Sequence, residues 1–480
     1  MKSRAFHPNF ETDDELERLA ALYMAHGAKR YPHLAAAFFC SPLSARTPDL
    51  NLTWHPVFRR RHLWRLWVSF SVSLLVALPK GFARMFLGSA PKGFCRYGAA
   101  SSTLLVLTSS CGSESQNADF QTSYVSTKPD NALFVYGPLR GLGRKKHPFA
   151  AWSFSRKVTT TVDLVRAGVS GCLAVGGTAL ERCILFFIWM NWTVSLAWYE
   201  LIQLEETLER IIRSEKIGKV GCVHEMHYYT RAVWRAASLA GARTHTVQHA
   251  CVAAGKTWYR TYPEERAAGL ALPQVFFVFD QRSAAVLQPW FPGTQIRFGC
   301  SQRYAHWIDR EPEASVDDSG SYLFVAGLAN FDNEVVLNAL RVLLRSPHDG
   351  QEVRLRLHPH AQLNFGQRRW LARLQARGMI ELSTRELQDD IREARVVVGM
   401  STSVLEEALL MEKPVVQLRD SRYRVFLDLA DVPGLSTLAW RDLSWDRLRS
   451  TTAGTTHQLF RSRLGLDKPI VTYGILFSNT

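Results

Sequence analysis

The sequence lacks paired cysteines: its eight cysteines are scattered singly, with no C-x-x-C pair and no histidine at zinc-finger spacing. This pattern argues against a structural zinc site or a disulfide framework and is typical of a reducing cytoplasm. The first residues also lack the apolar run that follows the charges of a secretory signal. No helix-turn-helix, zinc-finger or RNA-binding signature is present, so no nucleic-acid partner is expected.

Acidic residues are too few to balance the basic ones. The net charge of +15 over 480 residues indicates an anionic partner. The basic residues form short clusters, such as Arg59-Arg60-Arg61 and Arg144-Lys145-Lys146, beside aromatic and aliphatic runs. Such clusters favour an anionic membrane surface over a nucleic-acid duplex. A generally basic, solvated surface is the alternative.

No uncharged run reaches the roughly 20 residues that a membrane-spanning helix needs. Residues 66–78 follow a very basic segment but stop at Pro79-Lys80, and residues 183–199 are rich in aromatic side chains. We expect peripheral attachment to a membrane through the first run and its flanking arginines. The second run is either a core helix or a membrane-inserted one.

Beyond residue 100 the sequence alternates short apolar strands with helices, which is typical of α/β proteins. We therefore expect two Rossmann-like domains facing across a cleft, joined by an acidic linker at 311–320. The expected divisions are a helical, membrane-associating segment (1–100), a first domain (101–315) and a second domain (316–480). The predicted strands are 103–107, 132–136, 220–223, 244–248 and 275–279, then 322–326, 353–357, 379–382, 396–398 and 414–418.

The most distinctive motif follows the predicted strand 396–398, where Ser401, Thr402 and Ser403 lead into a predicted helix at 404–411. Backbone N–H groups and hydroxyls at such a turn bind anions, and in these sheets ligands lie beyond the carboxyl ends of the strands. One residue is enough to cap a helix, so three hydroxyls predict a phosphate site. Capping alone is the alternative. Gly327 follows the strand 322–326 and is expected to lie at the same phosphate site, where it would contact the phosphate-bearing ligand.

Further candidates lie on the same set of elements. Glu407 is four residues after Ser403, so both share a helix face, and its carboxylate is expected to accept hydrogen bonds from ribose hydroxyls. A solvated face is the alternative for Glu407 and its neighbour Glu406. His358, followed by Pro359, ends the strand 353–357, where a histidine can bind phosphate or act as a general acid.

The first set of strands contributes a possible base. Glu225 stands between His224 and His227 after a predicted strand, and a carboxylate there can deprotonate an acceptor hydroxyl. Helix capping or a buried ion pair is the alternative, and a His-x-x-His metal pair has no evident third ligand. Gln248 and His249 open a loop of small residues that can close over a phosphate or a sugar.

These motifs in this order resemble GT-B glycosyltransferases that build bacterial surface carbohydrate. The matching segments, within about residues 215–420, are the Gln-His loop, "VFFVFD", "IRFGCSQRY", "LRLHPH" and "VGMSTSVLEEALLMEKPVVQL". The resemblance is closest to enzymes that use CMP-activated sugars: bacterial sialyltransferases, polysialyltransferases and Kdo transferases. CDP-glycerol and CDP-ribitol polymerases of the teichoic acid type also carry a His-Pro pair.

The resemblance implies that His358, Pro359 and Ser401 to Ser403 grip the donor phosphate and that Glu407 binds the ribose. Related enzymes have a glycine where Ala250 follows the Gln-His pair, so close backbone approach there is in doubt.

The resemblance also implies a glycosyltransferase that moves Kdo or a related acidic sugar from a CMP donor. The acceptor would be a lipopolysaccharide, O-antigen or capsule glycan, met at the cytoplasmic face of the bacterial inner membrane, where the protein is expected to be peripheral. No metal or cofactor beyond the nucleotide sugar is expected, with His358 as acid and Glu225 as base. The alternatives are a CDP-glycerol/ribitol-type phosphotransferase, a sugar-nucleotide epimerase, and a non-catalytic polysaccharide assembly protein on the same fold.

Overall fold

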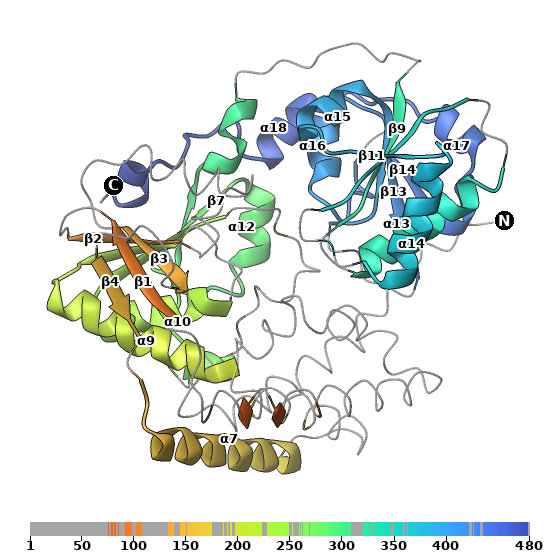
Figure 1. Ribbon diagram of the computed structural model, residues 1–480. Coiled ribbons are helices and arrows are strands. Elements are labelled where there is room, and N and C mark those ends of the chain that lie inside the picture. The colour runs from red at the N-terminus through yellow and green to blue at the C-terminus, as the bar shows by residue number, and fades with distance from the viewer. Residues whose placement is uncertain are drawn as a thin grey trace.

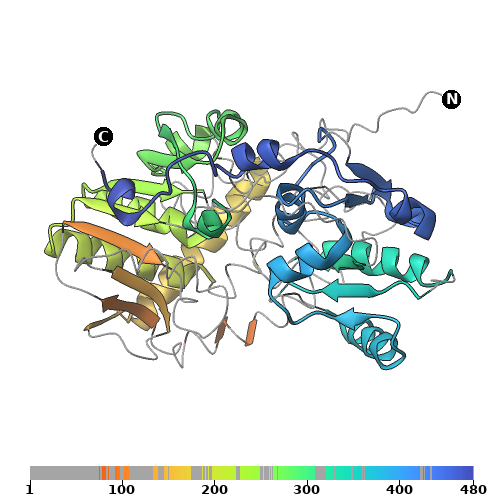
Figure 2. The same cartoon turned by 90° about the horizontal axis from the view of Figure 1, so that it is seen from above.

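The computed structural model describes most of residues 151–174, 197–248, 259–308, 320–358, 361–421 and 427–478. It also describes a few isolated positions and four earlier strands, which are β1 (Lys92–Tyr97), β2 (Thr103–Leu107), β3 (Leu133–Pro138) and β4 (Lys145–Pro148). Two α/β domains lie side by side, each built around its own sheet (Figure 1). Seen from above, the C-terminal segment runs back from the second domain to the first (Figure 2).

The first domain contains an eight-stranded sheet in the order β4-β1-β3-β2-β5-β6-β7-β8. All strands run in one direction except β1, which is antiparallel to β3 and β4. The later strands are β5 (Lys219–Cys222), β6 (Arg243–Val247), β7 (Val275–Val278) and β8 (Gln295–Phe298). The helices are α7 (Phe154–Ala174), α9 (Ala197–Ser214), α10 (Tyr228–Leu239), α11 (Pro263–Ala267), α12 (Gln281–Leu287) and the 3-10 helix η5 (Gln302–Trp307). Helix α10 packs against α9, β5 and β6.

The second domain is built on six parallel strands. They are β9 (Ser321–Val325), β10 (Val353–Arg356), β11 (Glu381–Leu382), β12 (Ala394–Gly399), β13 (Val415–Arg419) and β14 (Ser436–Ala439). Their spatial order, β11-β10-β9-β12-β13-β14, is the 3-2-1-4-5-6 order of a Rossmann fold. In that fold the ligand binds where the order reverses, which here is the position between β9 and β12.

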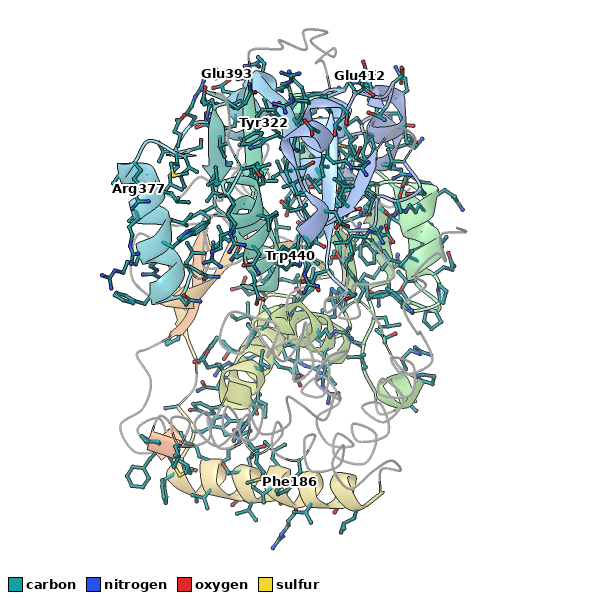
Figure 3. All side chains as sticks on the ribbon, turned by 90° about the vertical axis from the view of Figure 1, so that its right-hand side faces the viewer. Phe186, Tyr322, Arg377, Glu393, Glu412 and Trp440 are labelled. Atoms are coloured by element: carbon teal, nitrogen blue, oxygen red, sulfur yellow. The ribbon has the colours of Figure 1, made fainter. Side chains whose placement is uncertain are left out.

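Helices connect these strands: α13 (Asn330–Leu343), α14 (Phe365–Ala376), α15 (Leu387–Glu393), α16 (Val404–Leu410), α17 (Trp445–Arg449), α18 (His457–Arg463) and the 3-10 helix η6 (Trp440–Asp442). Figure 3 shows Tyr322 within the sheet and Arg377 at the end of the outer helix α14.

Local sequence explains where the elements start and stop. β7 (VFFV), β9 (SYLFV) and β12 (ARVVVG) are mainly apolar and almost wholly buried, as expected for parallel strands covered on both faces. Helices begin at polar caps: Asp280 accepts from the backbone N–H of Ser283 at 2.8 Å, and Asn364 with Gln367 forms a capping box.

An apolar cluster joins the two domains. Its first-domain members come from the segments that follow β7 and β8, and its second-domain members come from β9, β12 and α16. The cluster includes Phe279, Cys300, Tyr304, Trp307, Leu323, Val325, Val397 and Leu405. Arg461 also donates to the carbonyl of Ile308 at 2.9 Å. The central strands of the second sheet therefore pack directly against the first domain.

The last residues of the chain return to the first sheet. The backbone N–H of Val471 donates to the carbonyl of Cys300 at 2.8 Å, and helix α19 (Tyr473–Leu476) follows. Two glycines of the first domain make space for this segment. A Cβ at Gly299 would lie 2.4 Å from Val471, and one at Gly221 would lie 2.7 Å from Phe477. The last residues of 316–480, the range expected to form the second domain, thus pack against the first sheet.

The expected α/β fold of two Rossmann-like domains is confirmed, and every predicted strand is present within a few residues. Strands β1, β4, β8 and β14 are additional. β1 lies inside residues 1–100, which were expected to be helical, so that expectation is wrong for Lys92–Tyr97. β8 and β14 are sheet edges with exposed residues and no apolar run, which hides them in the sequence.

Other expectations fall on residues outside the described part of the chain: most of 66–78, most of 183–199 and nearly all of the linker 311–320. Among the described residues, no helix is both long and apolar enough to cross a membrane.

Removal of the Phe477 ring tests the C-terminal return. Phe477 is buried, with its ring centroid 4.8 Å from that of Tyr473 and 5.8 Å from that of His245. We expect Phe477→Ala to lower the free energy of unfolding by about 3 kcal/mol because it empties a buried site. Phe365→Ala, at a ring that is 80% exposed, is the control and should change stability by less than about 0.5 kcal/mol. Equal thermal midpoints for the two variants would show that the return does not stabilise the protein.

Candidate functional site

Three neighbouring strands of the second sheet end at one level. The register of β10, β9 and β12 pairs their final residues, which are Arg356, Val325 and Gly399. His358, Gly327 and Ser401 each lie two residues beyond these partners. Because adjacent strands are about 4.8 Å apart, the three residues occupy one short stretch of the carboxyl edge. That stretch contains the point where the strand order reverses.

The turn from β12 into α16 carries the three hydroxyl residues, all of them half-buried. The Thr402 hydroxyl accepts a hydrogen bond from the backbone N–H of Val404 at 3.3 Å, so it caps the helix. Ser403 occupies the N-cap position but makes no side-chain cap bond. Helix capping therefore falls to Thr402 rather than to Ser403.

The buried side-chain amide of Gln417 fixes the position of this turn. Gln417 of β13 is fully buried, and its Nε2 donates to the carbonyl of Met400 at 2.9 Å. Its Oε1 accepts from the backbone N–H of Leu429 at 3.1 Å. The turn is thereby fixed to the sheet and to the loop after β13 rather than left to solvent.

Asp332 connects the two sides of the switch point. It lies in the first turn of α13, is only 4% exposed, and accepts a hydrogen bond from the backbone N–H of Ser401. A Cβ at Gly327 would lie 2.2 Å from Oδ2 of Asp332, so the carboxyl fits only because residue 327 is glycine. The end of β9 and the turn after β12 are thus held against one side chain.

Some buried polar atoms in the first turn of α13 have no partner among the described residues. Oδ1 of Asp332 and both side-chain polar atoms of the fully buried Asn333 have no hydrogen bond among the described residues. Burial raises the pKa of Asp332 to about 7, while the Ser401 hydrogen bond acts in the opposite direction. Near neutral pH this carboxyl carries less negative charge than an ordinary aspartate, which reduces the repulsion of an anion at this edge.

The end of β10 is anchored separately. Nη1 of Arg356 donates to Oδ2 of Asp390 at 2.7 Å and to the carbonyl of Arg385 at 2.6 Å. His358 follows, half-buried, and its carbonyl accepts from the N–H of Ala361 at 2.8 Å. The sheet therefore brings His358 to the same edge as Ser401, with β9 between their strands.

Other candidates have different surroundings. Glu406 and Glu407 are 2% and 4% exposed, so the solvated-face alternative is wrong for both, and a ribose contact by Glu407 stays a prediction.

Gln248 of the first domain is fully buried with internal contacts: its Nε2 donates to Ser283 Oγ at 3.2 Å and its Oε1 accepts from the N–H of Phe279 at 3.0 Å. A contact of Gln248 with the donor stays a prediction. Glu225, His249 and Pro359 lie outside the described residues, although β5 ends three residues before Glu225.

Asp332 and Asn333 are the site residues that sequence reasoning missed. An acidic residue in the first turn of a helix is ordinary, because it interacts favourably with the helix dipole. In the sequence, only the glycine at position 327 pointed to them. A glycine there indicates that another group comes close to the backbone, but it does not identify that group. As for cation binding, the described residues contain no group of three side chains that could hold a metal ion.

Comparison with known proteins gives similarity of shape only. No protein-family model matches the sequence, and no curated protein matches it. Staphylococcus aureus MnaA in complex with UDP is 14% identical, with 77% of this chain and 91% of that chain covered and a TM-score of 0.41. Anabaena HepE in complex with UDP and glucose is 10% identical, with 76% and 96% covered and a TM-score of 0.42. Acinetobacter baumannii MurG is 14% identical, with 56% and 73% covered and a TM-score of 0.33.

These identities and TM-scores are too low to support an argument about function or to assign a family. The class of the protein follows from its own strand order and site. It is a two-domain α/β protein with a polar, partly exposed strand edge at the switch point of its second, Rossmann-type sheet.

Asp332→Asn tests the electrostatic state of this edge. Because folding raises the pKa of Asp332 from 3.8 to about 7, the native state binds its proton more tightly than the unfolded state. Native stability is therefore highest below the unfolded pKa and is lost as the pH rises through about 7, by at most roughly 4 kcal/mol. We expect Asp332→Asn to melt above wild type at pH 8 and close to it at pH 4.

The exposed Asp446 supplies the control, since Asp446→Asn should shift the thermal midpoint little at either pH. A wild-type pH profile in Asp332→Asn would mean that Asp332 does not carry the raised pKa.

Proposed function

We propose that the protein is a GT-B-type glycosyltransferase that takes a sugar from a nucleotide donor bound on the second domain. The observation that carries the proposal is the alignment of Gly327, His358 and Ser401 at the ends of three adjacent strands, at the reversal of a 3-2-1-4-5-6 sheet. Nucleotides bind in the crevice at that position in Rossmann folds. The short helix α16, with 7 residues, adds only a modest dipole, so the turn itself and its anchors are the main support.

In the proposed reaction an acceptor hydroxyl attacks the anomeric carbon as its bond to the donor phosphate breaks. The leaving phosphate takes the bonding electrons, and the turn at Ser401, Thr402 and Ser403 stabilises its charge with N–H and O–H donors. His358 donates a proton to that phosphate, and Glu225 accepts the proton of the acceptor hydroxyl. The donors at the turn would do work that a metal ion does in other transferases.

The nature of the donor rests on the sequence resemblance. The His-Pro and Ser-Thr-Ser motifs are similar to those of CMP-sugar-dependent enzymes, which supports a CMP-activated acidic sugar such as Kdo. A CDP-glycerol or CDP-ribitol donor is the closest competing proposal, because those enzymes share the His-Pro pair. The acceptor we propose is a lipopolysaccharide, O-antigen or capsule glycan at the cytoplasmic face of the inner membrane, in keeping with the net charge of +15.

A nucleotide panel tests the donor site. Calorimetry with CMP, CDP, UMP, UDP, GDP and ADP should give selective binding of CMP to the wild type. Ser403→Ala should weaken that binding about tenfold or more, the loss of one hydrogen bond to a charged phosphate. Ser444→Ala is the matched control: Ser444 caps α17 in the same domain, so its loss should lower stability and leave binding unchanged.

Binding of a nucleotide other than CMP would change the proposed function. Preference for CDP would favour the phosphotransferase, and preference for UDP or GDP would overturn the cytidine donor. No binding of any nucleotide would overturn the transferase and favour the assembly protein.

His358→Ala and His358→Gln test the proposed acid. The assay is CMP release from CMP-Kdo or CMP-sialic acid in the presence of a lipopolysaccharide acceptor. We expect kcat to fall about 100-fold or more in both variants, because neither side chain can donate the proton. Glutamine should keep more of the nucleotide affinity than alanine, since it can still donate a hydrogen bond. Unchanged kcat in both variants would remove His358 from the mechanism.

A further inference from the structure

Exposed apolar side chains are concentrated on one part of the first domain. Of the ten large hydrophobic residues that are exposed in the described chain, seven lie on α7 and on the described positions of residues 75–82. On α7 they are Phe154 (51% exposed), Val162 (41%), Val169 (42%) and Leu173 (75%). Large exposed apolar surface on a folded protein usually marks an interaction site.

The apolar residues of α7 share one face. Phe154, Val162, Val169 and Leu173 fall within about 100° of one another on a helix with 3.6 residues per turn. The 21-residue helix is roughly 30 Å long, so the stripe extends along most of it. The opposite side turns inward, where Leu164 belongs to the core of the first domain.

A second set of exposed apolar residues lies on the described positions of residues 75–82. Leu75 (67% exposed), Leu78 (48%) and Phe82 (66%) have helical spacing and face outward, while Met85 packs against the core. Nζ of Lys157 donates to the carbonyl of Met85 at 3.4 Å, which places this segment beside α7. Figures 1 and 3 agree that α7 lies along the edge of the molecule, far from the second sheet.

Charge identifies the kind of partner. Residues 50–113 and 131–162 contain no aspartate or glutamate, and the second run carries Arg140, Arg144, Lys145, Lys146 and Arg156. On α7 itself Arg166 is exposed, whereas Lys157 is buried. Asp163 is the single acidic residue of α7, and Arg156 is paired with Glu206 of α9. An apolar helical stripe in a basic, acid-poor region matches a bilayer surface with anionic headgroups. The helix is too polar to span the bilayer, so it would lie in the interface plane.

We propose that the outer face of α7, together with Leu75, Leu78 and Phe82, is the surface by which the protein docks on an anionic phospholipid bilayer. The apolar side chains enter the headgroup region, and exposed basic side chains such as Arg166 contact lipid phosphates. This proposal deepens the proposed function, since docking there would bring the enzyme to a lipid-linked acceptor. Docking itself needs neither donor nor acceptor.

The test is co-sedimentation of the full-length protein with vesicles of phosphatidylcholine, alone or mixed equally with phosphatidylglycerol. Wild type should bind the mixed vesicles and bind them less in high salt. The triple variant Val162→Ser, Val169→Ser, Leu173→Ser should bind roughly tenfold more weakly or worse. The control Leu239→Ser with Phe298→Ser, which removes similarly exposed side chains elsewhere, should bind as wild type does. Unchanged thermal midpoints verify that every variant is folded.

Three results would overturn the docking proposal. One is equal binding by wild type and the triple variant, and another is an equal loss in the control. The third is a change of oligomeric state in the triple variant without a change in vesicle binding, which would assign the face to a second copy of the chain. Because the vesicle assay contains no nucleotide and the nucleotide panel contains no lipid, failure of docking and failure of the transferase proposal are distinguishable.

Discussion

The pairing of β9 with β12 is the contact on which the second domain depends. These two strands are far apart in the sequence, yet they lie side by side at the centre of the sheet because the strand order reverses between them. On one face their side chains, such as Leu323 and Val397, belong to the apolar cluster that also contains Phe279 of the first domain. On the other face, side chains such as Phe324 and Val398 form the core of the second domain itself. The same pairing thus sets the core of one domain, its junction with the other, and the level at which Gly327 and Ser401 leave the sheet.

Buried polar side chains make that edge rigid. Gln417 holds the turn after β12, Asp390 holds the end of β10 through Arg356, and Asp332 links the end of β9 to Ser401. Donors held in place before a ligand arrives stabilise developing charge without reorganisation, which is what an anion site requires. The stripe on α7 lies on the other domain. One sheet would therefore position the donor while the other domain meets the membrane.

Much of the fold was predictable because its central strands carry strong local signals. Runs such as 322–326 and 396–398 are continuous and apolar, as strands buried on both faces must be. The edge strands β8 and β14 have mixed polarity, since one side of an edge strand meets solvent, and periodicity does not distinguish them from loops. The antiparallel β1 was missed for a related reason: its sequence, KGFCRY, mixes charged and apolar residues.

For the site, the sequence by itself determined which groups are present: a hydroxyl turn after one strand, a histidine after another and a glycine after a third. It determined neither their common level, which the register of three parallel strands decides, nor the burial of Glu406 and Glu407. Only the tertiary structure placed Asp332 against Gly327 and Ser401 and turned Gln248 inward. Pairing register and burial depend on contacts between residues distant in the chain, and local sequence patterns carry no record of those contacts.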